Sequence, residues 1–528
     1  MRFICIAISA YLFCSLATST PLDDYVNREE SVYGWKYLNE TFKTVFGGQA
    51  HVLNVTTQTW LDKSRAGVFI GNDQYTNVWS HHVVVIVPKT LKTTNVSLAY
   101  LTGGCNQDGI PKSTDEDVLV ADEIAHSTSA VAIVVFQIPN CPVVFPRDPS
   151  KRHRDEDALI AWAWKEYLDG AQGKTPGGAD AKWLPRLPMV KGGMQSMRAV
   201  EDFLRGTLNV IPKDEEHGWI VAGASKRGWT TWMVGSVHCD ACVRIVGIAP
   251  LVPIVPSLHR EMHRQFQSYD GWTFAFKDYT DVNMTEHTDD PEFADALKII
   301  DPLYYGERLQ RLPKLVVLSS NDEFMSFDWS NVWYDEMKGE THLLIAQNSE
   351  HSLATGLPEV LSCMSTFARS IAIGQGETQR PSFDYTFNGT EGSIRVVPRG
   401  SLKPSKVVMR HSQTISSERR DFRWIRASNN DTEKCTLPNI HLKKPVFGAD
   451  CFVPIVWIGT TLEAESDGSY VAKAPKPFDG HWSGFYVELY FPAEFSSSDY
   501  QFTSPGFTFP NTLPFADCSG ASCKGKLV

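Results

Sequence analysis

The stretch WIVAGASKRGWTTW, residues 219–232, decides the fold. A run of apolar residues ends in small residues around Ser225, and a stretch with two positive charges that can form a helix follows. A serine in a tight turn between a strand and a helix is typical of the nucleophile elbow of α/β-hydrolases, where small neighbours are needed because the turn is strained. Gly223 stands two residues before the serine, as that motif requires, but Arg227 stands two residues after it and Gly228 comes one later. The pattern is a variant of the elbow, and a merely tight turn is the alternative interpretation.

Two segments downstream of Ser225 supply the partners that a nucleophilic serine needs. KLVVLSS is followed by Asn-Asp-Glu, which places Asp322 just after a predicted strand, and HLLIAQNS is followed by Glu-His, which places His351 just after the next one. The triad of an α/β-hydrolase has the same chain order, and parallel strands end at one edge of the sheet. The histidine would take the serine proton and the acid would fix its tautomer. We therefore predict a triad of Ser225, His351 and Asp322, with Glu323 as the alternative acid.

An oxyanion hole needs one backbone N–H from the residue after the nucleophile and one from the loop after the third strand. The first requirement predicts the N–H of Lys226. The second falls in LTGGCNQDG, where Gly103 and Gly104 directly follow an apolar strand. Glycines allow the backbone to approach a ligand closely, although they are equally typical of a simple turn.

Strands and helices alternate through the first part of the chain. AVAIVVFQIP is continuously apolar, as strands buried on both faces of a parallel sheet are, and DEDALIAWAWKEYL has helical spacing. This predicts an α/β-hydrolase fold, a mostly parallel sheet with helices on both faces, over residues 20–378. A segment at about 255–312, rich in aromatic and acidic residues, interrupts the pattern and is expected to form a cap over the sheet edge. Short alternating strands over 379–528 predict a small C-terminal antiparallel β-sandwich.

The first residues, 1–19, have the pattern of a signal peptide: an early arginine, a short apolar run and a small-x-small cleavage site. The net charge of −11 does not favour binding to nucleic acid or to anionic membranes, and no later apolar run is long enough to suggest membrane insertion. We expect a secreted, extracellular and glycosylated protein. The six N-x-S/T sequons are at Asn39, Asn54, Asn95, Asn283, Asn388 and Asn430.

Nine of the eleven cysteines follow the predicted signal peptide, and an extracellular setting favours disulfides among them. Cys435 with Cys451, and Cys518 with Cys523, are plausible local pairs. The Cys-Asp-Ala-Cys stretch at 239–242 could form a redox pair or half of a metal site, but no second such stretch or nearby histidine pair accompanies it. We predict no metal and no cofactor.

Several stretches together resemble one known family, the PhoPQ-activated pathogenicity-related proteins. These stretches extend over nearly the whole mature chain and include TPLDDYV, LTGGCN, QIPNCP, RDEDALIAWAW, LPMVKGGMQSMRAVEDF, VAGASKRGWTTW, IAPLV and SSNDEF with SEHS. The resemblance implies an α/β-hydrolase fold related to serine peptidases. It is strongest to a secreted amoebal member, which implies a secreted signal that represses proliferation and repels cells of its own population.

One departure from the family concerns Cys105 and Cys141, where we expect other residues in the bacterial members. The resemblance implies an extra disulfide between them, near the active edge. In that case Cys239, Cys242 or Cys363 would supply the odd thiol.

Three functions remain open from the sequence. The first is a secreted serine hydrolase of the peptidase or aminopeptidase type. In it Asp155, Glu156 and Asp157 would bind a substrate amine, and Arg227 would contribute to substrate binding; the acids are also typical of a helix start. The second is a non-catalytic ligand for a cell-surface receptor on a hydrolase scaffold. The third is an esterase or carbohydrate-active hydrolase, in which tryptophans of the sandwich would stack on sugars. The expected partners are a peptide or small ester substrate and, for the second function, a receptor.

Overall fold

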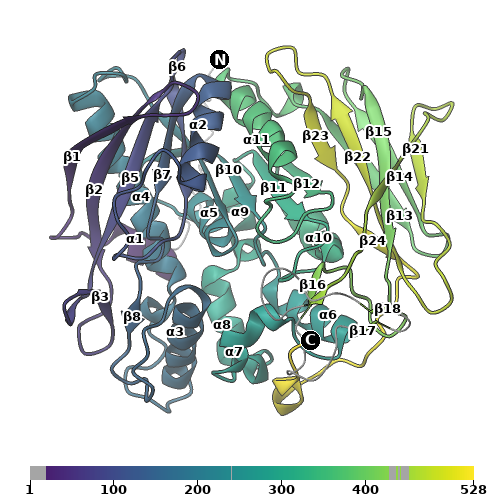
Figure 1. Ribbon diagram of the computed structural model, residues 1–528, viewed down its shortest axis with the longest axis horizontal. Helices are drawn as coiled ribbons and strands as arrows, with labels where there is room; N and C mark the ends of the chain where they lie inside the picture. The colour runs from purple at the N-terminus through teal and green to yellow at the C-terminus, as the bar shows by residue number, and fades with distance from the viewer. Residues whose placement is uncertain (1–18, 240, 427–435, 438–439, 442–450) are drawn as a thin grey trace, which may run out of the picture.

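The apolar runs of the first 350 residues build one nine-stranded sheet (Figure 1). The computed structural model describes residues 19–239, 241–426, 436–437, 440–441 and 451–528, so the predicted signal peptide, apart from Ser19, lies outside the described residues. In chain order the strands are β1 (Gly34–Lys43), β2 (Gln49–Thr59), β5 (Val78–Val87), β6 (Thr93–Leu101), β7 (Ala130–Val135), β9 (Gly218–Ala224), β10 (Arg244–Leu251), β11 (Lys314–Ser319) and β12 (Thr341–Ala346).

The order of the strands in space is β1-β2-β5-β7-β6-β9-β10-β11-β12. The three pairings β1–β2, β2–β5 and β5–β7 are antiparallel. Every pairing from β7 onward to β12 is parallel. Strand β9 lies in the middle of the parallel part, between β6 and β10. This strand order, with helices on both faces, is the α/β-hydrolase fold that the sequence predicts. It places the loops after β9, β11 and β12 at one edge of the sheet.

Helices cover both faces of the sheet because each face carries its own apolar core. Side chains of α2 (Glu116–Thr128) and α11 (Leu357–Ala372) belong to one core. Side chains of α3 (Glu156–Ala171), α4 (Arg186–Gly206) and α5 (Lys226–Ser236) belong to the other, which α1 (Pro21–Asn27) joins.

Helix α4 lies close against the sheet although the residues of its first turns do not favour a helix. Its first turns contain Pro188 and a Gly-Gly pair, residues that usually argue against a helix. The proline lies in the first turn, where its missing N–H costs nothing. A Cβ at Gly192 would stand 3.0 Å from Nε2 of His81, so the glycine lets the helix lie close against the sheet.

The segment predicted as a cap consists of short helices at the sheet edge below the strands in Figure 1. Contacts of α3 with α7 and α8 join this segment to the sheet-covering helices. Its elements are α6 (Leu258–Tyr269), η2 (Phe274–Phe276), α7 (Lys277–Thr280), η3 (Met284–His287), α8 (Pro291–Ile300), η4 (Pro302–Tyr305) and α9 (Gly306–Leu309).

The C-terminal part forms two packed antiparallel sheets beside β12 and α11 (Figure 1). The rings of Phe387 and Phe507 stack between them at 4.1 Å, and the amide of Ile345 donates to the Thr503 hydroxyl across the junction with the main sheet. One sheet contains β13 (Ser382–Asn388), β14 (Ser393–Arg399) and β21 (Tyr470–Lys473). The other contains β15 (Lys406–Gln413), β20 (Ile458–Thr461), β22 (Ser483–Phe491), β23 (Tyr500–Thr503) and β24 (Phe507–Phe509).

The remaining elements are small. They are β3 (Gly67–Gly71), β4 (Gln74–Thr76), β8 (Val143–Val144), η1 (Ala181–Trp183), η5 (Phe327–Trp329), α10 (Ser330–Trp333), η6 (Tyr334–Glu336), η7 (Glu377–Gln379), β16 (Ile425–Arg426), β17 (Thr436–Leu437), β18 (Ile440–His441), β19 (Cys451–Phe452) and η8 (Gly520–Lys524).

The tryptophans considered for sugar stacking are mostly interior residues of the C-terminal part. Trp457 and Trp482 are buried, and Trp424 is partly buried against the core. They therefore offer no exposed stacking platform, which removes the sequence argument for a carbohydrate-binding module.

Three disulfides join described cysteines: Cys105–Cys141, Cys239–Cys242 and Cys518–Cys523. Among the described residues, Cys363 is the free thiol, and it is buried. Cys435, half of another predicted pair, lies outside the described residues.

Four of the sequon asparagines are exposed, as glycosylation requires: Asn39, Asn95, Asn283 and Asn388. Asn54 is half-buried on β2, and Asn430 lies outside the described residues. No helix in the described ranges is both long and apolar enough to cross a membrane.

Candidate active site

Ser225 occupies a strained turn between β9 and α5. Its backbone has φ 57° and ψ −122°, a conformation that a residue with a side chain rarely adopts. The Ser225 amide donates to the Leu251 carbonyl at 2.9 Å, which ties the turn to the end of β10. The turn has the backbone form of a nucleophile elbow, and it puts the serine hydroxyl at the sheet edge.

The two glycines around the turn are required by close backbone contacts. A Cβ at Gly223 would lie 2.9 Å from the Leu101 carbonyl oxygen, and one at Gly228 would lie 2.3 Å from the Leu251 carbonyl oxygen. Glycine is therefore needed three residues after the serine in this chain. The position two residues after it can hold Arg227, whose side chain extends away toward Glu156 and Ile138.

Ser225, His351 and Asp322 lie together and form a continuous chain of hydrogen bonds. The Nε2 atom of His351 is 2.9 Å from the Ser225 hydroxyl, and its Nδ1 atom is 2.9 Å from both carboxylate oxygens of Asp322. Asp322 is buried, and its Oδ1 also accepts the Phe324 amide at 2.7 Å. The histidine can thus accept the serine proton on one nitrogen while the acid orients the other.

Glu323, the alternative acid, contacts the main chain of His351. Its Oε2 accepts the backbone N–H of His351 at 2.8 Å rather than a ring nitrogen. Burial, together with the neighbouring Asp322 carboxylate, raises the pKa of Glu323 to about 7. Asp322, and not Glu323, therefore holds the imidazole ring.

Two opposing effects set the proton affinity of His351. Burial lowers its pKa, because a charged ring is poorly solvated there, but the Asp322 carboxylate, its hydrogen bond and the nearby Glu323 carboxylate together outweigh this effect. The pKa of His351 is consequently above the ordinary value of 6.5. A raised pKa makes the imidazole a better base, provided that the pH is high enough to leave it neutral.

A cavity opens beside the serine, and its walls are mostly apolar. Ser225, Lys226 and His351 line one side of it, together with Trp229 and Phe324. The cap segment supplies the opposite wall with Leu258, Met262, Phe276, Tyr279, Met284 and Phe293. A ligand bound next to Ser225 would be covered by the cap and largely shielded from water.

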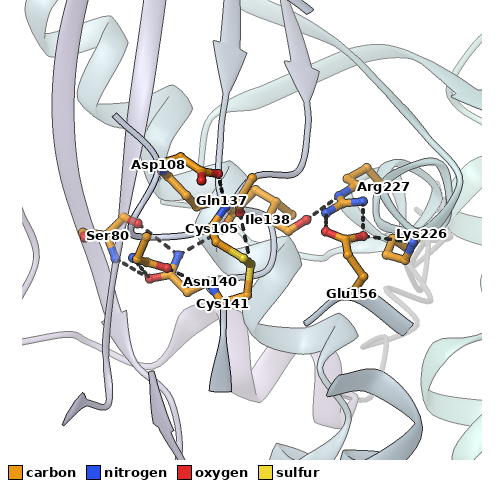
Figure 2. Close-up of a disulfide and its surroundings, with 12 residues drawn as sticks. Ser80, Cys105, Asp108, Gln137, Ile138, Asn140, Cys141, Glu156, Lys226 and Arg227 are labelled. Carbon is orange, nitrogen blue, oxygen red and sulfur yellow. Dashed lines mark hydrogen bonds and ion pairs between the residues drawn. A yellow bond between two sulfur atoms is a disulfide. The ribbon is translucent and has the colours of Figure 1, made fainter. Parts of the chain in front are cut away.

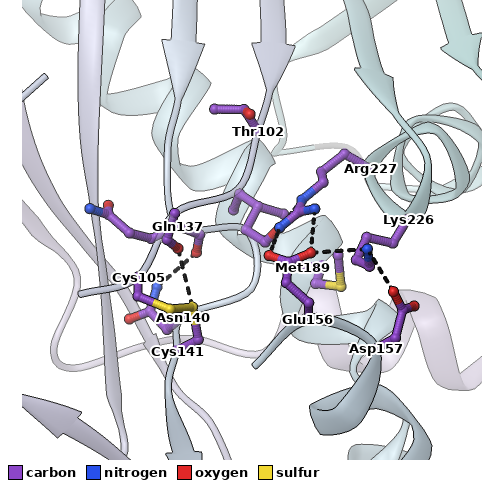
Figure 3. Close-up of polar contacts among 12 residues, drawn as sticks. Thr102, Cys105, Gln137, Asn140, Cys141, Glu156, Asp157, Met189, Lys226 and Arg227 are labelled. Atoms are coloured by element: carbon purple, nitrogen blue, oxygen red, sulfur yellow. Dashed lines mark hydrogen bonds and ion pairs between the residues drawn. A yellow bond between two sulfur atoms is a disulfide. The ribbon is translucent and has the colours of Figure 1, made fainter. Parts of the chain in front are cut away.

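A network of ion pairs surrounds the residues that follow the nucleophile (Figure 3). Lys226 Nζ lies 3.0 Å from both Glu156 and Asp157, and Arg227 makes a two-point contact with Glu156. Burial raises the pKa of Glu156, but Arg227 and Lys226 outweigh it and hold that pKa at about 2. Asp155, the third acid of the stretch, is exposed at the start of α3.

The contacts of this network bear on the prediction that Asp155, Glu156 and Arg227 bind substrate. Glu156 and Arg227 bind each other, and neither lines the cavity beside Ser225. Asp157 does line it, and there it pairs with Lys226 and accepts the Tyr279 hydroxyl at 3.0 Å. The substrate-binding role of the first three residues stays a prediction.

Gly103 and Gly104 line a separate surface hollow together with Thr102 and Arg227, not the cavity beside Ser225. The side chain of Arg227 fills the space next to Gly103, where a Cβ would lie 2.7 Å from its Nη2. Lys226, by contrast, begins α5 and lines the cavity, with its N–H in the first turn of the helix. The oxyanion roles of all three residues stay predictions.

The disulfide between Cys105 and Cys141 closes the loop that follows Gly104 (Figure 2). Beside it, the side chain of Asn106 donates to Asn140 at 2.8 Å. Asn140 and Cys141 belong to the loop after β7, and the carbonyl of Ile138 in that loop accepts a hydrogen bond from Arg227. The covalent bond thus fastens the loop after β6 to the loop that holds the Arg227 side chain.

Arg186, another residue that lines the cavity, belongs to no motif visible in the sequence. Its guanidinium lies over the Trp229 ring, 4.2 Å from the ring centroid, and donates to the Lys226 carbonyl at 2.5 Å. Burial lowers the pKa of Arg186 to about 10. A buried arginine in α4 can be recognised only from the packing of α4 on α5, which no local motif signals.

The fold and this geometry define the class of protein: an α/β-hydrolase with a serine, a histidine and an aspartate hydrogen-bonded at the ends of β9, β12 and β11. The chain belongs to the family of PhoPQ-activated pathogenicity-related proteins, whose profile matches residues 22–423.

A relative and two solved structures show similarity over much of the chain. Autocrine proliferation repressor protein A of Dictyostelium discoideum is 33% identical over 513 residues, which cover 95% of this chain and 92% of that protein. Acetyl xylan esterase from Paenibacillus sp. R4 has a TM-score of 0.41 and 12% identity, covering 66% of this chain and 92% of that one. Acetyl xylan esterase 1 from Thermoanaerobacterium sp. has a TM-score of 0.39 and 12% identity, covering 66% and 91%.

Replacing Gly228→Ala should destabilise the protein by about 2–4 kcal/mol, because the added Cβ meets the backbone oxygen of Leu251. Urea unfolding of the purified variant measures this. Gly206→Ala is the matched control, because that helical glycine has open space around its Cβ position and should change stability by no more than about 1 kcal/mol. Equal effects of the two substitutions would contradict the role assigned to Gly228.

Proposed function

We propose that this protein is an extracellular serine hydrolase, with Ser225 as nucleophile, His351 as general base and Asp322 as the acid that orients the histidine. The observation that carries the proposal is the unbroken hydrogen-bond chain from the Ser225 hydroxyl through both ring nitrogens of His351 to a buried carboxylate. That chain begins at a strained turn and faces a cavity, which is where a nucleophile would meet its substrate.

The reaction follows from these positions. Ser225 Oγ forms a bond to the carbonyl carbon of the substrate while its proton passes to Nε2 of His351. The carbonyl oxygen becomes negatively charged, and the N–H of Lys226 is the proposed donor to it. The leaving alcohol or amine departs with the proton from His351. Water then attacks the acyl carbon and loses a proton to His351, and His351 passes this proton to Ser225 Oγ as the acid leaves.

The cavity walls favour an uncharged, apolar acyl group. Most of the lining is aliphatic or aromatic. Of the charged groups in it, Asp157 pairs with Lys226, and the Arg186 guanidinium lies over the Trp229 ring and donates to the Lys226 carbonyl. Glu156 is likewise neutralised by Lys226 and Arg227. An N-terminal amine would have to break these ion pairs in order to bind, which is costly for buried charges. We therefore propose a carboxylic ester with an apolar acyl group as the substrate class, ahead of a peptide with a free amine.

The biological role we propose is repression of proliferation by a secreted protein. The support for it is the similarity to a protein named autocrine proliferation repressor, which extends over almost the entire length of both chains. The disulfides and the exposed sequon asparagines fit an extracellular setting. The alternative is that the protein acts on a cell-surface receptor without catalysis. The Ser225→Ala substitution described next distinguishes this alternative from a catalytic role.

Ser225→Ala should abolish hydrolysis of a chromogenic medium-chain acyl ester, lowering kcat/KM by at least about 10³-fold, because the nucleophile is lost. The native protein and the Ser225→Ala variant are then compared in a growth assay on the cells that produce the protein. Loss of repression with loss of hydrolysis supports a catalytic signal, whereas full repression by the inactive variant supports a receptor ligand. An unchanged esterase rate would contradict the proposed nucleophile.

The pH profile tests the pairing of His351 with Asp322. In the native protein kcat/KM should rise with pH through a pKa above 6.5, because the raised pKa of His351 keeps the base protonated below it. In Asp322→Asn the carboxylate that raises this pKa is gone and burial remains, so the rise should move to a pH below 6.5 and the plateau should fall by about 10⁴-fold. Identical profiles for the two proteins would contradict the pairing.

A further inference from the structure

Two histidines and an aspartate meet on the outer side of the cap, away from Ser225. His259 and His263 lie one turn apart on α6, and Asp289 lies in the loop before α8. The Nε2 atoms of both histidines approach the same carboxylate oxygen, Asp289 Oδ1, at 3.2 and 3.1 Å. The two imidazole rings lie side by side, with 4.5 Å between their centroids.

These spacings are those of ligand atoms around a small metal ion. Atoms bonded to tetrahedral Zn²⁺ at about 2.0–2.1 Å lie about 3.3 Å from one another. Hydrogen bonding accounts for only one of the two contacts: His259 bonds to Asp289, whereas Nε2 of His263 is buried with no hydrogen-bond partner among the described residues. A buried nitrogen without such a partner needs an explanation, and a metal bond supplies one.

The second nitrogen of His263 has the partner that metal-binding histidines usually have. Its Nδ1 lies 2.8 Å from Asp517 Oδ1, from the C-terminal segment. A carboxylate at that position accepts a hydrogen bond from Nδ1–H, which keeps the ring proton on Nδ1 and leaves the lone pair of Nε2 free to bind a metal. In that tautomer the Nε2 lone pair faces the Asp289 oxygen, so two electron-rich atoms repel each other. A cation bound between them would turn this repulsion into attraction.

The ligand types select the kind of ion. Two imidazole nitrogens and one carboxylate oxygen suit Zn²⁺ and neighbouring transition metals, not Mg²⁺ or Ca²⁺, which prefer oxygen ligands alone. Cys518 also lies nearby, but its sulfur is bonded to Cys523 and is no longer a thiolate.

Neighbouring positive charges do not oppose a cation, because each is neutralised elsewhere. Arg260 pairs with Glu336 at 2.5 Å, and Arg264 pairs with Asp328 at 2.6 Å. The prediction of no metal rested on the cysteine stretch at 239–242, which does not include these residues.

We propose that His259, His263 and Asp289 bind one divalent transition-metal ion of the Zn²⁺ type, and that Asp517 positions His263 for it. The ion would join α6, the loop before α8 and the C-terminal segment. The inner face of α6 contributes Leu258 and Met262 to the wall of the cavity beside Ser225. Metal binding would therefore fasten the cap from outside and stabilise the covered form of that cavity.

The first experiment titrates Zn²⁺ into the tag-free, EDTA-dialysed full chain by calorimetry and follows thermal unfolding. We expect about one equivalent to bind with a Kd of about 1 μM or tighter, and Tm to rise with Zn²⁺ but not with Mg²⁺. His259→Ala with Asp289→Asn should weaken binding by more than about 100-fold, and Asp517→Asn alone by about 10-fold. His287→Gln, which removes a different His–Asp pair of the cap, should bind as the native chain does.

No Zn²⁺ binding by the native chain, or equal affinity in the His259/Asp289 double variant, would overturn the proposal and leave the cluster as imidazolium–carboxylate ion pairs. Equal Tm values in EDTA show that a variant is folded. For a variant that fails to fold, diffraction at the zinc edge from native crystals soaked in Zn²⁺ decides the question. An anomalous peak bonded to His259 and His263 supports the site, and peaks confined to other residues contradict it.

Discussion

The hydrogen bond from the Ser225 amide to the Leu251 carbonyl holds the turn on which the rest of the site depends. A residue in that backbone conformation costs on the order of 1–3 kcal/mol, and the cost must be offset by the surrounding structure. The offset comes from the position of β9 between two parallel neighbours and from the close packing of α5 that Gly223 and Gly228 permit. Strain at one residue is thus supported by a buried strand in the middle of the parallel part of the sheet.

Charge and apolar surface are separated around that turn. Lys226 and Arg227 directly follow the nucleophile, yet the acids of α3 neutralise them at one side of the site. The remaining walls of the cavity are apolar and come largely from the cap. In such surroundings the Asp322 carboxylate acts on His351 through a low dielectric, and together with Glu323 it keeps the pKa of His351 raised despite burial.

The site residues that could be predicted from the sequence are those whose positions follow from the order of the strands. Ser225, Asp322 and His351 could be selected because each directly follows a strand, and parallel strands end at one edge. The contacts of Glu156 and Arg227 could not be predicted, because they depend on the distance between α3 and α5. The sequence also could not choose among the three acids at the start of α3: Asp157 lines the cavity, whereas Asp155, two residues earlier, is exposed.

The histidine cluster on the cap illustrates the same limit. The four-residue spacing of His259 and His263 is visible in the sequence, but Asp289 and Asp517 join them only through the packing of the cap against the C-terminal segment. A single chain without its fold offers no signal that connects these distant residues.

The most direct measurement of the central claim is to locate a covalent fluorophosphonate adduct on the native protein by peptide mass spectrometry. A phosphonate of this kind reacts with a serine that a neighbouring base has activated. The account predicts a single adduct on the peptide that contains Ser225, formed faster as the pH rises above the ordinary pKa of histidine. No adduct, or an adduct on a different serine, would contradict the claim that Ser225, His351 and Asp322 form a working nucleophilic site.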